Sequence, residues 1–466
     1  MSGPARTLAA ERQELRELRE LRDAVRAVLD RHPGHAAWAP LTAQVGAAAL
    51  AVPQEYGGLG CGAPEVGVVM AELGRALSPV PYLSSAVLTV QALLASGDRQ
   101  ACARHLPRLA EGTLVGTLAW AESPAWPPAG SPGSLVGPRP GASPDPTSGE
   151  LPEAAPDPRP EPGTDPGAGP GDGAEAGPEA RAGAARDAAS GAGAGAAAGG
   201  GTGPGQGPGP RTGRGGWEVA DTITLAVPDG EGWLLTGTKR YVLAGPAEPA
   251  LVLVFAVIGS DPAPGSAPGQ GTGIGRLGLF ELAAAPAAFT VRSTLDRTRP
   301  LAELTLDRTP ARLLSADGAA VLARVRDLAC TALAAEQVGA AAQALELTVR
   351  YAKDRIQFGR PIGSFQAVKH RLADMHTAVE TAGALAAAAA RADAPPRLAA
   401  AAKSACSQAY AYVAGEMIQL HGGIGITWEH PAHEFFKRAH GSALLFGSPA
   451  AHRARLAADL GFGGPV

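Results

Sequence analysis

The sequence predicts an α+β chain in which helical segments precede and follow a β segment. Apolar residues recur at helical spacing near the N-terminus, and short runs rich in β-branched and aliphatic residues lie between Val219 and Leu306. From about Asp317 onward the chain is rich in Ala and Leu with few helix breakers. At 466 residues it is long enough for two or three domains. We expect a helical domain over residues 1–115, a β domain over 116–316 and a second helical domain over 317–466.

Composition and charge indicate a protein that handles a small molecule. The net charge of −4 and the pI near 6.2 come from interspersed acidic and basic residues, which leaves no basic surface for nucleic acid or an anionic membrane. The N-terminus lacks an apolar signal core, and the longest aliphatic run, Leu251 to Ile258, falls well short of the roughly 20 residues that a membrane helix requires. Four cysteines stand far apart without a CxxC pair, which argues against a disulfide framework and a zinc site and favours the cytoplasm.

The N-terminal domain is expected to begin with an amphipathic helix. From Glu11 to His32, apolar residues recur at steps of three and four among Arg and Glu, and we expect this helix to pack on its own domain. A membrane or partner helix is the alternative, which the balance of acidic residues and arginines disfavours. The helical pattern is interrupted from Val52 to Gly60, where Pro and Gly residues mark a turn.

Residues 127–216 differ in character from the rest of the chain. They consist largely of Gly, Pro and Ala, and between residues 131 and 210 the large apolar side chains are Leu135, Val136 and Leu151. Such a segment cannot bury enough apolar surface to offset its ordering entropy, so we expect it to be disordered. We interpret it as a tolerated surface insertion, because the cost of closing a loop grows only slowly with its length, with a tether or docking segment as the alternative.

A small antiparallel β domain is expected around and after this insertion. Its predicted strands are short, rich in β-branched and aliphatic residues, and separated by turn signals such as Pro228 to Gly232. The strands are expected at Val219–Val227, Trp233–Leu243, Leu251–Ile258, Leu277–Leu282 and Leu301–Leu306.

The C-terminal domain is expected to consist of long helices. In one of them apolar residues alternate by three and four from Phe365 to Val379, and Ser364 stands where an N-cap is expected. The preceding segment, Arg355 to Gly363, is a basic, glycine-bearing turn that leads into the N-terminus of this helix. A phosphate-bearing ligand fits there, and an ordinary loop with a solvated Arg fits equally well.

Two long stretches of this domain resemble the flavin-dependent acyl-CoA dehydrogenases. They are YAKDRIQFGRPIGSFQAVKHRLADM, from Tyr351 to Met375, and QLHGGIGITWEHPAHEFFKRA, from Gln419 to Ala439. The turn at Val52 to Gly60 and the order of helical, β and helical segments are similar to that family as well. The resemblance covers the chain apart from residues 127–216 and implies the acyl-CoA dehydrogenase fold, assembled as a dimer of dimers.

The resemblance implies an FAD site that is shared between subunits. Two strips of this sequence match the family positions that contact the adenine and pyrophosphate half of the FAD held by a neighbouring subunit. Glycines in such a strip let backbone amides approach a diphosphate closely. The matching residues are Arg355, Phe358 and Gln366 in the first strip and Gln419, Gly422 and Gly423 in the second.

The resemblance leaves the catalytic base unassigned. The family removes the α-proton of an acyl-CoA thioester with a glutamate while a hydride leaves the β-carbon for the flavin. The two places where the family carries this glutamate fall on Ala329 and Phe446, and neither side chain can take a proton. Glu336 is the nearest acid on the same predicted helix, about 10 Å further along its axis, so a structural role is favoured over a relocated base.

The contacts to the flavin ring also depart from the family. Its threonine-glutamate-proline-glycine stretch reads Ala121, Glu122 and Ser123 here before the insertion begins, so the threonine hydroxyl is lost. The family's tryptophan and threonine near the flavin correspond to Tyr241, which can still cover the ring, and Leu243, which offers only backbone hydrogen bonds.

Two other patterns are interpreted as structural. His430 and His433 stand three residues apart, but Pro431 between them and the missing HExxH pattern argue against a metal site, and these two, like His421 and His440, are expected on the surface or in the core. The GTGIG stretch from Gly271 to Gly275 lacks both the GxGxxG spacing and a following helix, so a loop is expected rather than a dinucleotide site.

Three functions follow from the resemblance. The first is an FAD-dependent acyl-CoA dehydrogenase component that acts in the α,β-desaturation of an acyl-CoA and passes electrons to an electron-transfer flavoprotein. The second is a non-catalytic structural subunit, and the third is a flavin monooxygenase on the same fold. The residues for a neighbour's FAD are intact while those for this chain's own ring and base are altered. We therefore expect a hetero-tetramer with a second acyl-CoA dehydrogenase chain, with a homo-tetramer as the alternative.

Overall fold

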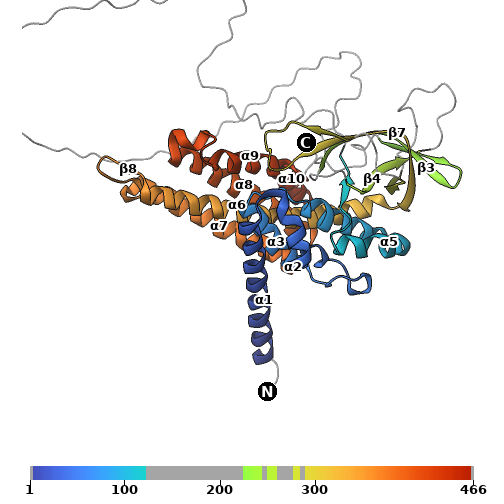
Figure 1. Ribbon diagram of the computed structural model, residues 1–466, viewed down its shortest axis with the longest axis horizontal. Coiled ribbons are helices and arrows are strands. Elements are labelled where there is room, and N and C mark those ends of the chain that lie inside the picture. The colour runs from blue at the N-terminus through green and yellow to red at the C-terminus, as the bar shows by residue number, and fades with distance from the viewer. Residues whose placement is uncertain (1–3, 122–223, 244–248, 260–275, 284–288, 463–466) are drawn as a thin grey trace, which may run out of the picture. The chain divides into compact units, whose positions relative to one another are not determined.

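The computed structural model describes residues 4–121, 224–243, 249–259, 276–283 and 289–462 of the chain. The predictions for residues 127–216, for the loop at Gly271 to Gly275 and for Glu122 and Ser123 lie outside these ranges. The described elements run in the predicted order of helices, strands and helices (Figure 1). The α+β class, with a helical domain on each side of a β domain along the chain, is therefore confirmed.

The N-terminal domain is a group of helices around a shared apolar core. The turn predicted at Val52 to Gly60 is present and contains two glycines in the left-handed region, Gly57 at φ +81° and Gly60 at φ +67°. The elements are α1 (Pro4–Arg31), η1 (Gly34–Ala37), α2 (Trp38–Val45), η2 (Ala47–Ala49), η3 (Gln54–Tyr56), α3 (Ala63–Arg75), the π-helical segment η4 (Tyr82–Thr89), α4 (Val90–Ser96) and α5 (Arg99–Ala110).

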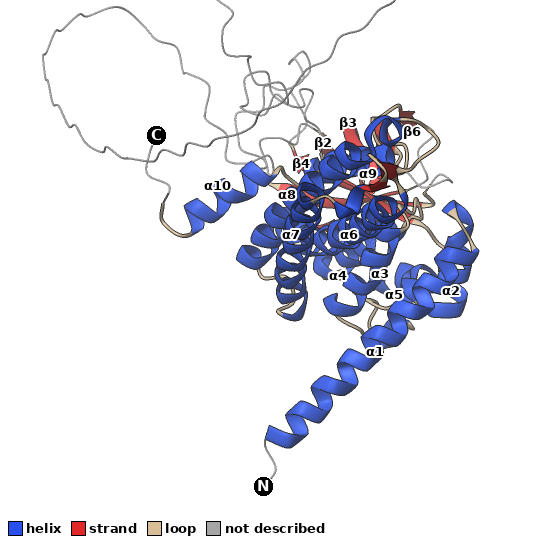
Figure 2. Cartoon of the chain, turned by 90° about the vertical axis from the view of Figure 1, so that its left-hand side faces the viewer, coloured by secondary structure: helices blue, strands red, loops and turns tan. Residues whose placement is uncertain are grey.

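The helix α1 packs on its own domain along its second half only. Val25 and Val28 are buried there, whereas Leu15 is 49% exposed. Figure 2 shows the N-terminal half of α1 extending away from the other helices. Pairs four residues apart, such as Arg16 with Glu20, support this half in water. The packing prediction is correct for the second half and wrong for the first, because the helix runs past the edge of its domain.

The β domain is a mixed sheet, so the antiparallel prediction is wrong in part. β4 pairs in parallel with both β1 and β2, while the other pairings are antiparallel. The sheet closes on itself, because successive strands pair in the order β4, β2, β3, β7 and β5, and β5 pairs again with β4. The closed sheet surrounds an apolar interior that includes Phe280 and Leu304. The strands are β1 (Gly116–Ala119), β2 (Leu225–Asp229), β3 (Gly232–Leu243), β4 (Leu251–Ile258), β5 (Leu277–Leu282), β6 (Phe289–Arg292) and β7 (Leu301–Ser315).

The C-terminal domain is built around the long helix α6. This helix contacts the helices α7, α8 and α9 of its own domain, α3 of the N-terminal domain and β5 of the sheet (Figures 1 and 2). It therefore connects its own domain to the other two. No helix in the described part of the chain is long and apolar enough to cross a membrane. The elements are α6 (Gly318–Asp354), β8 (Ile356–Gln357), β9 (Arg360–Pro361), η6 (Ile362–Ser364), α7 (Gln366–Arg391), α8 (Pro396–His421), η7 (Gly422–Ile426), α9 (Ala432–Leu444) and α10 (Pro449–Asp459).

The apolar stripe of α7 is confirmed, but its predicted cap is wrong. Met375 and Val379 are buried, as their spacing predicts. The helix begins at Gln366 after Phe365, without a side-chain cap. The Ser364 hydroxyl instead donates to Pro361 O at 2.7 Å, because η6 intervenes between the hairpin and the helix.

Candidate active site and cofactor surface

The two positions predicted for a base are both buried in the structure. Ala329 is on α6 and Phe446 is in the turn between α9 and α10, and both are fully buried in the same apolar cluster. Cys330 Sγ, on the residue next to Ala329, lies 3.9 Å from Phe446 O. The residue next to Ala329 thus contacts the backbone of Phe446, and neither the Ala329 nor the Phe446 side chain can accept a proton.

Aromatic and aliphatic side chains surround Phe446. The Phe446 ring stacks on Trp120, just after β1, with 4.7 Å between ring centroids. The buried Leu243 belongs to the same cluster, and its carbonyl accepts a hydrogen bond from Thr117 Oγ1 at 3.0 Å. The backbone of Phe446 has a φ of +58°, in the left-handed region that residues other than Gly adopt rarely. Such residues cluster at functional sites.

Tyr241 and Ala121 lie on the neighbouring edge of the sheet. The β3–β7 register breaks between Lys239 and Val242, and in this bulge Tyr241 has a φ of +57° and is half-buried. Ala121 forms an isolated bridge with Arg240, the residue before Tyr241. The ring-side positions that the sequence singled out are thus neighbours in the structure.

Buried polar groups fix the turn that carries Phe446. His452 Nε2 lies 2.9 Å from Phe446 O, and Lys403 Nζ donates to the carbonyls of Ser442 and Ala443, each at 3.1 Å. Burial lowers the pKa of His452 to about 4 and that of Lys403 to about 8. Burial raises the pKa of the Cys330 thiol to about 12, so it is protonated near pH 7 and is not a nucleophile.

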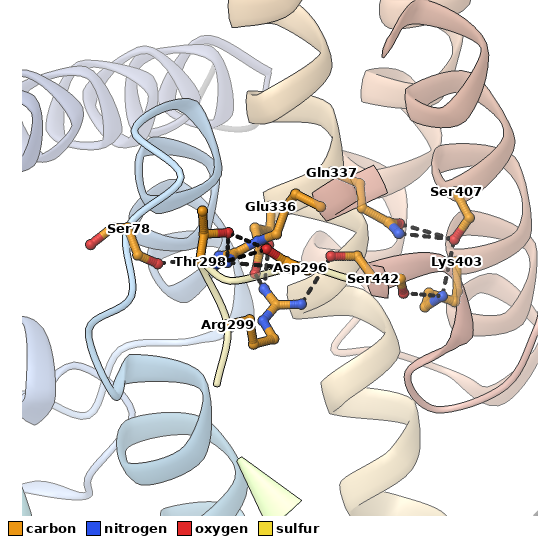
Figure 3. A network of polar contacts seen from close by, with 10 residues as sticks. Ser78, Asp296, Thr298, Arg299, Glu336, Gln337, Lys403, Ser407 and Ser442 are labelled. Carbon is orange, nitrogen blue, oxygen red and sulfur yellow. Dashed lines mark hydrogen bonds and ion pairs between the residues drawn. The ribbon is translucent and has the colours of Figure 1, made fainter. Parts of the chain in front are cut away.

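Glu336 is held by two arginines, Arg299 and Arg438, rather than poised as a base. Figure 3 shows Glu336 beside Arg299. Arg299 binds both of its carboxylate oxygens, and Arg438 Nε donates to Oε1 at 3.0 Å. Arg438 also donates to Ser78 O in the N-terminal domain and to Thr298 in the β domain. Burial alone would raise the pKa of Glu336, but the two guanidiniums outweigh it and hold this pKa below its usual range.

The cavity beside this network is too small for an acyl group. It measures about 30 Å³ and is lined by Glu336, both arginines and apolar residues that include Leu243. This volume admits a water molecule or two. The Glu336 network therefore joins the N-terminal, β and C-terminal domains beside a small cavity. The geometry favours a structural role, as the spacing along α6 also predicts.

The strips predicted to contact FAD are on the surface. Arg355, Gln366 and Gln419 are exposed, and Phe358 at the tip of the β8–β9 hairpin is 92% exposed with a φ of +51°. Gly422 and Gly423 follow α8, and the space where a Cβ would lie at either residue is open. Exposed amides, a guanidinium and open glycines suit a diphosphate that reaches this surface from another chain.

A contact between two aromatic residues joins the strips, and sequence reasoning missed it. Tyr351, four residues before Arg355, donates from its hydroxyl to His421 O at 3.3 Å, next to Gly422. His421 was predicted only as a surface or core histidine. His421 and His430 have rings in contact, but within the described ranges no group of three His, Cys, Asp or Glu side chains is placed to hold a metal ion.

Solved structures with the same fold define the class of protein. A structure described as the Tcur3481-Tcur3483 steroid ACAD G363A variant matches with a TM-score of 0.64 at 25% identity, over 96% of this chain and 98% of that chain. The ChsE4-ChsE5 complex from Mycobacterium tuberculosis matches with a TM-score of 0.66 at 22% identity, over 96% of this chain and 98% of that chain. The fold is the acyl-CoA dehydrogenase fold.

Sequence comparison places the chain within that class. The acyl-CoA dehydrogenase N-terminal domain model matches residues 15–113, and the C-terminal domain model matches residues 317–461. The acyl-CoA dehydrogenase IpdE2 of Mycobacterium tuberculosis is 52% identical over 157 residues, which are 34% of this chain and 47% of that protein. The chain belongs to the acyl-CoA dehydrogenase family, and its match spans about half the length of this relative.

Proposed function

We propose that this chain is a subunit of an FAD-dependent acyl-CoA dehydrogenase that desaturates the α,β-bond of an acyl-CoA thioester. In this proposal the chain provides the surface that holds the adenine and pyrophosphate half of FAD, and a second acyl-CoA dehydrogenase chain provides the base. One observation carries the proposal. Both base positions, Ala329 and Phe446, are fully buried in an apolar cluster, while the FAD strips are exposed.

The chemistry of the exposed strips fits FAD. Arg355 supplies a charged donor for a phosphate, Gln366 and Gln419 supply amides, and Gly422 and Gly423 leave backbone N–H groups open to approach. Bound FAD would supply the hydride acceptor of the reaction. The contribution of this chain is to bind and orient the cofactor from its diphosphate end.

The flavin-ring half of FAD would find few of the family's contacts in this chain. Ala121 and Leu243 stand where the family has hydroxyl contacts to the flavin ring, and Phe446 packs against Trp120 where a carboxylate would take the α-proton. Tyr241 remains as a residue that can cover the ring. Glu336 cannot serve as the base in place of these residues, because accepting a proton would break its ion pairs with Arg299 and Arg438.

Relatives support an assembly with a second chain. The similar steroid enzyme is described under two protein names, Tcur3481 and Tcur3483. We extend this to a hetero-tetramer here, with an acyl-CoA as substrate, an electron-transfer flavoprotein as electron acceptor and the cytoplasm as location. The buried base positions also favour a second function, that of a structural subunit that binds no cofactor.

Purification of the chain alone separates these functions. We expect a colourless protein with little FAD and little acyl-CoA desaturation. Co-expression with a dehydrogenase chain that carries the glutamate should give a yellow complex that bleaches with an acyl-CoA. A complex without flavin at the shared interface supports the structural subunit. A chain that binds one FAD and desaturates an acyl-CoA by itself contradicts the proposal.

A further inference from the structure

We propose that the stacked rings of Tyr351 and His421, with the tilted ring of His430 against them, couple the two FAD strips and make the coupling sensitive to acid. The inference rests on the proposed function for the identity of the ligand, since these strips are the ones assigned to FAD. The coupling itself belongs to this chain alone and is tested without a cofactor.

The first two rings connect segments that are far apart in the sequence. Tyr351 lies in the last turn of α6, just before Arg355, and His421 is the last residue of α8, just before Gly422. Their ring centroids are 4.3 Å apart with planes 24° from parallel, and the Tyr351 hydroxyl donates to the His421 carbonyl. Through this contact the position of Arg355 depends on the position of Gly422.

The third ring secures the segment that follows the glycines. The His430 ring lies 4.3 Å from the His421 ring, and His430 Nδ1 accepts a hydrogen bond from the backbone N–H of Ala432 at the start of α9. The chain between Gly422 and His430 thus begins and ends at the stack. Movement of His421 would release the end of this segment that carries Gly422 and Gly423 and would remove the ring on which His430 packs.

The hydrogen bonds of His421 favour its neutral form. Its Nδ1 donates to Met417 O at 2.7 Å, while its buried Nε2 has no hydrogen-bond partner among the described residues. A second proton would therefore place a charge on Nε2 within the stack. Burial and then the neighbouring His430 hold the pKa of His421 below its usual range, although the Met417 carbonyl favours the charged form.

The charged groups around the stack do not offset this effect. Tyr351 faces His421 from α6, and His430 faces it from the segment before α9. Burial and then His433 lower the pKa of His430, and His433 itself has Lys437 and Glu434 as neighbours on α9. The carboxylate of Glu434 therefore acts on His433, and the ionisable group that acts on the pKa of His421 is His430, which lowers it.

The sign of the pH effect follows from the lowered pKa. A histidine whose folded pKa lies below its unfolded value of about 6.5 contributes stability that is present above that value and is lost as the pH falls. At acid pH the His421 ring leaves the stack to take up its proton. The strips then move independently, and the grip on a diphosphate that needs both of them weakens.

Hydrogen exchange on the chain alone tests the coupling. Protection of residues 351–358 and 419–430, corrected for the intrinsic effect of pH, should fall together in the wild type between about pH 7.5 and pH 5.5. His421→Phe keeps a ring in the stack and removes the titration, so its protection should stay constant. His440→Phe is the matched control, because His440 Nδ1 contacts the Phe436 carbonyl in the same way at 2.8 Å on α9.

Three outcomes on the chain alone would overturn the inference. Wild-type protection that does not change with pH removes the acid response. Loss at one strip without the other removes the coupling. An acid response that persists in His421→Phe assigns it to another group. The wild-type measurement keeps the inference testable even if the variant does not fold.

The second experiment uses the complex with the glutamate-bearing chain. FAD retention should weaken by up to about tenfold from pH 7.5 to pH 5.5 with the wild-type chain, and it should not change with pH when the chain carries His421→Phe. Unchanged retention in the wild type contradicts the proposed consequence for the cofactor. A complex without FAD instead contradicts the proposed function, and the exchange result then stands or fails on its own.

Discussion

At the residue scale, the proposed function depends most on one side chain. Phe446 stands at one of the two positions proposed for the base, is fully buried and stacked on Trp120, and its carbonyl contacts His452. A phenyl ring can neither take a proton nor stabilise one in transit. Arg355, on the exposed strip, keeps its charge and its access to a partner. The proposed base position is therefore buried and apolar at Phe446, whereas the proposed cofactor strip is exposed and charged at Arg355.

Arg355→Ala should lower FAD retention by the complex and leave folding unchanged. Loss of a charge-assisted hydrogen bond to a phosphate costs about 1.5–3 kcal/mol, which corresponds to at least about tenfold weaker binding. The measurements are flavin absorbance after gel filtration and far-ultraviolet circular dichroism. Arg324→Ala is the control, because Arg324 is a similarly exposed arginine on α6 that pairs with Asp393. Equal flavin content in the two variants would remove Arg355 from the site.

His452 should make the fold less stable in acid. Its pKa of about 4 lies below the unfolded value, so the stability that depends on neutral His452 is present above about pH 6.5 and is lost toward pH 4. The effect is on the order of 3 kcal/mol at its full extent. Urea unfolding of His452→Gln between pH 7.5 and 4.5 should show a flatter pH dependence than the wild type. The control His376→Gln alters an exposed histidine on α7 and should follow the wild type.

Sequence reasoning proposed the residues of the candidate site but not their partners. Ala329 and Phe446 were predicted as the two base positions, and both are fully buried in the structure. The structural role favoured for Glu336 agrees with its contacts, yet nothing near it in the sequence points to Arg299 or Arg438. Such long-range ion pairs leave no local pattern, because each partner is an ordinary charged residue in its own segment.

At the scale of elements, the turn between α9 and α10 is a closed structural unit. Lys403 on α8 binds carbonyls at the end of α9, and the left-handed residues Phe446 and Gly447 reverse the chain before α10. The Phe446 side chain points to Trp120 rather than to the lysine. The turn therefore presents an apolar side chain to an apolar cluster.

Phe446→Glu should destabilise the protein without giving it activity. An unpaired carboxylate at a fully buried site costs roughly 3–5 kcal/mol, unless the site opens or the group stays protonated. The midpoint of urea unfolding should fall further than for Phe446→Leu, which only removes the aromatic stack. Acyl-CoA desaturation by the variant alone should stay at the level of the wild type. Wild-type stability together with new activity would show that the site needs nothing but a carboxylate.

Elements with a strong local pattern were predicted well, and those defined by pairing were not. The strands at Leu251–Ile258 and Leu277–Leu282 have the predicted bounds. β7 extends to Ser315 because pairing with β3 and β5 outweighs a polar stretch around Arg308, which hid the strand. The parallel pairings of β4 could not be read from the sequence, since the direction of a partner strand leaves little mark on a short apolar run.

At the scale of the whole molecule, the Gly, Pro and Ala-rich segment should be dispensable for folding. It offers almost no apolar surface to a core. Replacement of Pro127 to Gly216 by a short Gly/Ser linker should change the melting temperature by no more than a few degrees. A linker of equal length that keeps the composition but shuffles the order is the control. A melting temperature lower by about ten degrees or more with the short linker would show that the segment packs on the protein.

The central claim is that this chain completes the cofactor site of another. The most direct test is the number of flavins per chain, measured by flavin absorbance and native mass spectrometry, for the chain alone and for its complex with the glutamate-bearing dehydrogenase chain. We predict little FAD and little desaturation for the chain alone, and a mixed tetramer with fewer flavins than chains whose flavin is bleached by an acyl-CoA. One FAD per chain in the protein alone, together with desaturation of an acyl-CoA, would contradict the account.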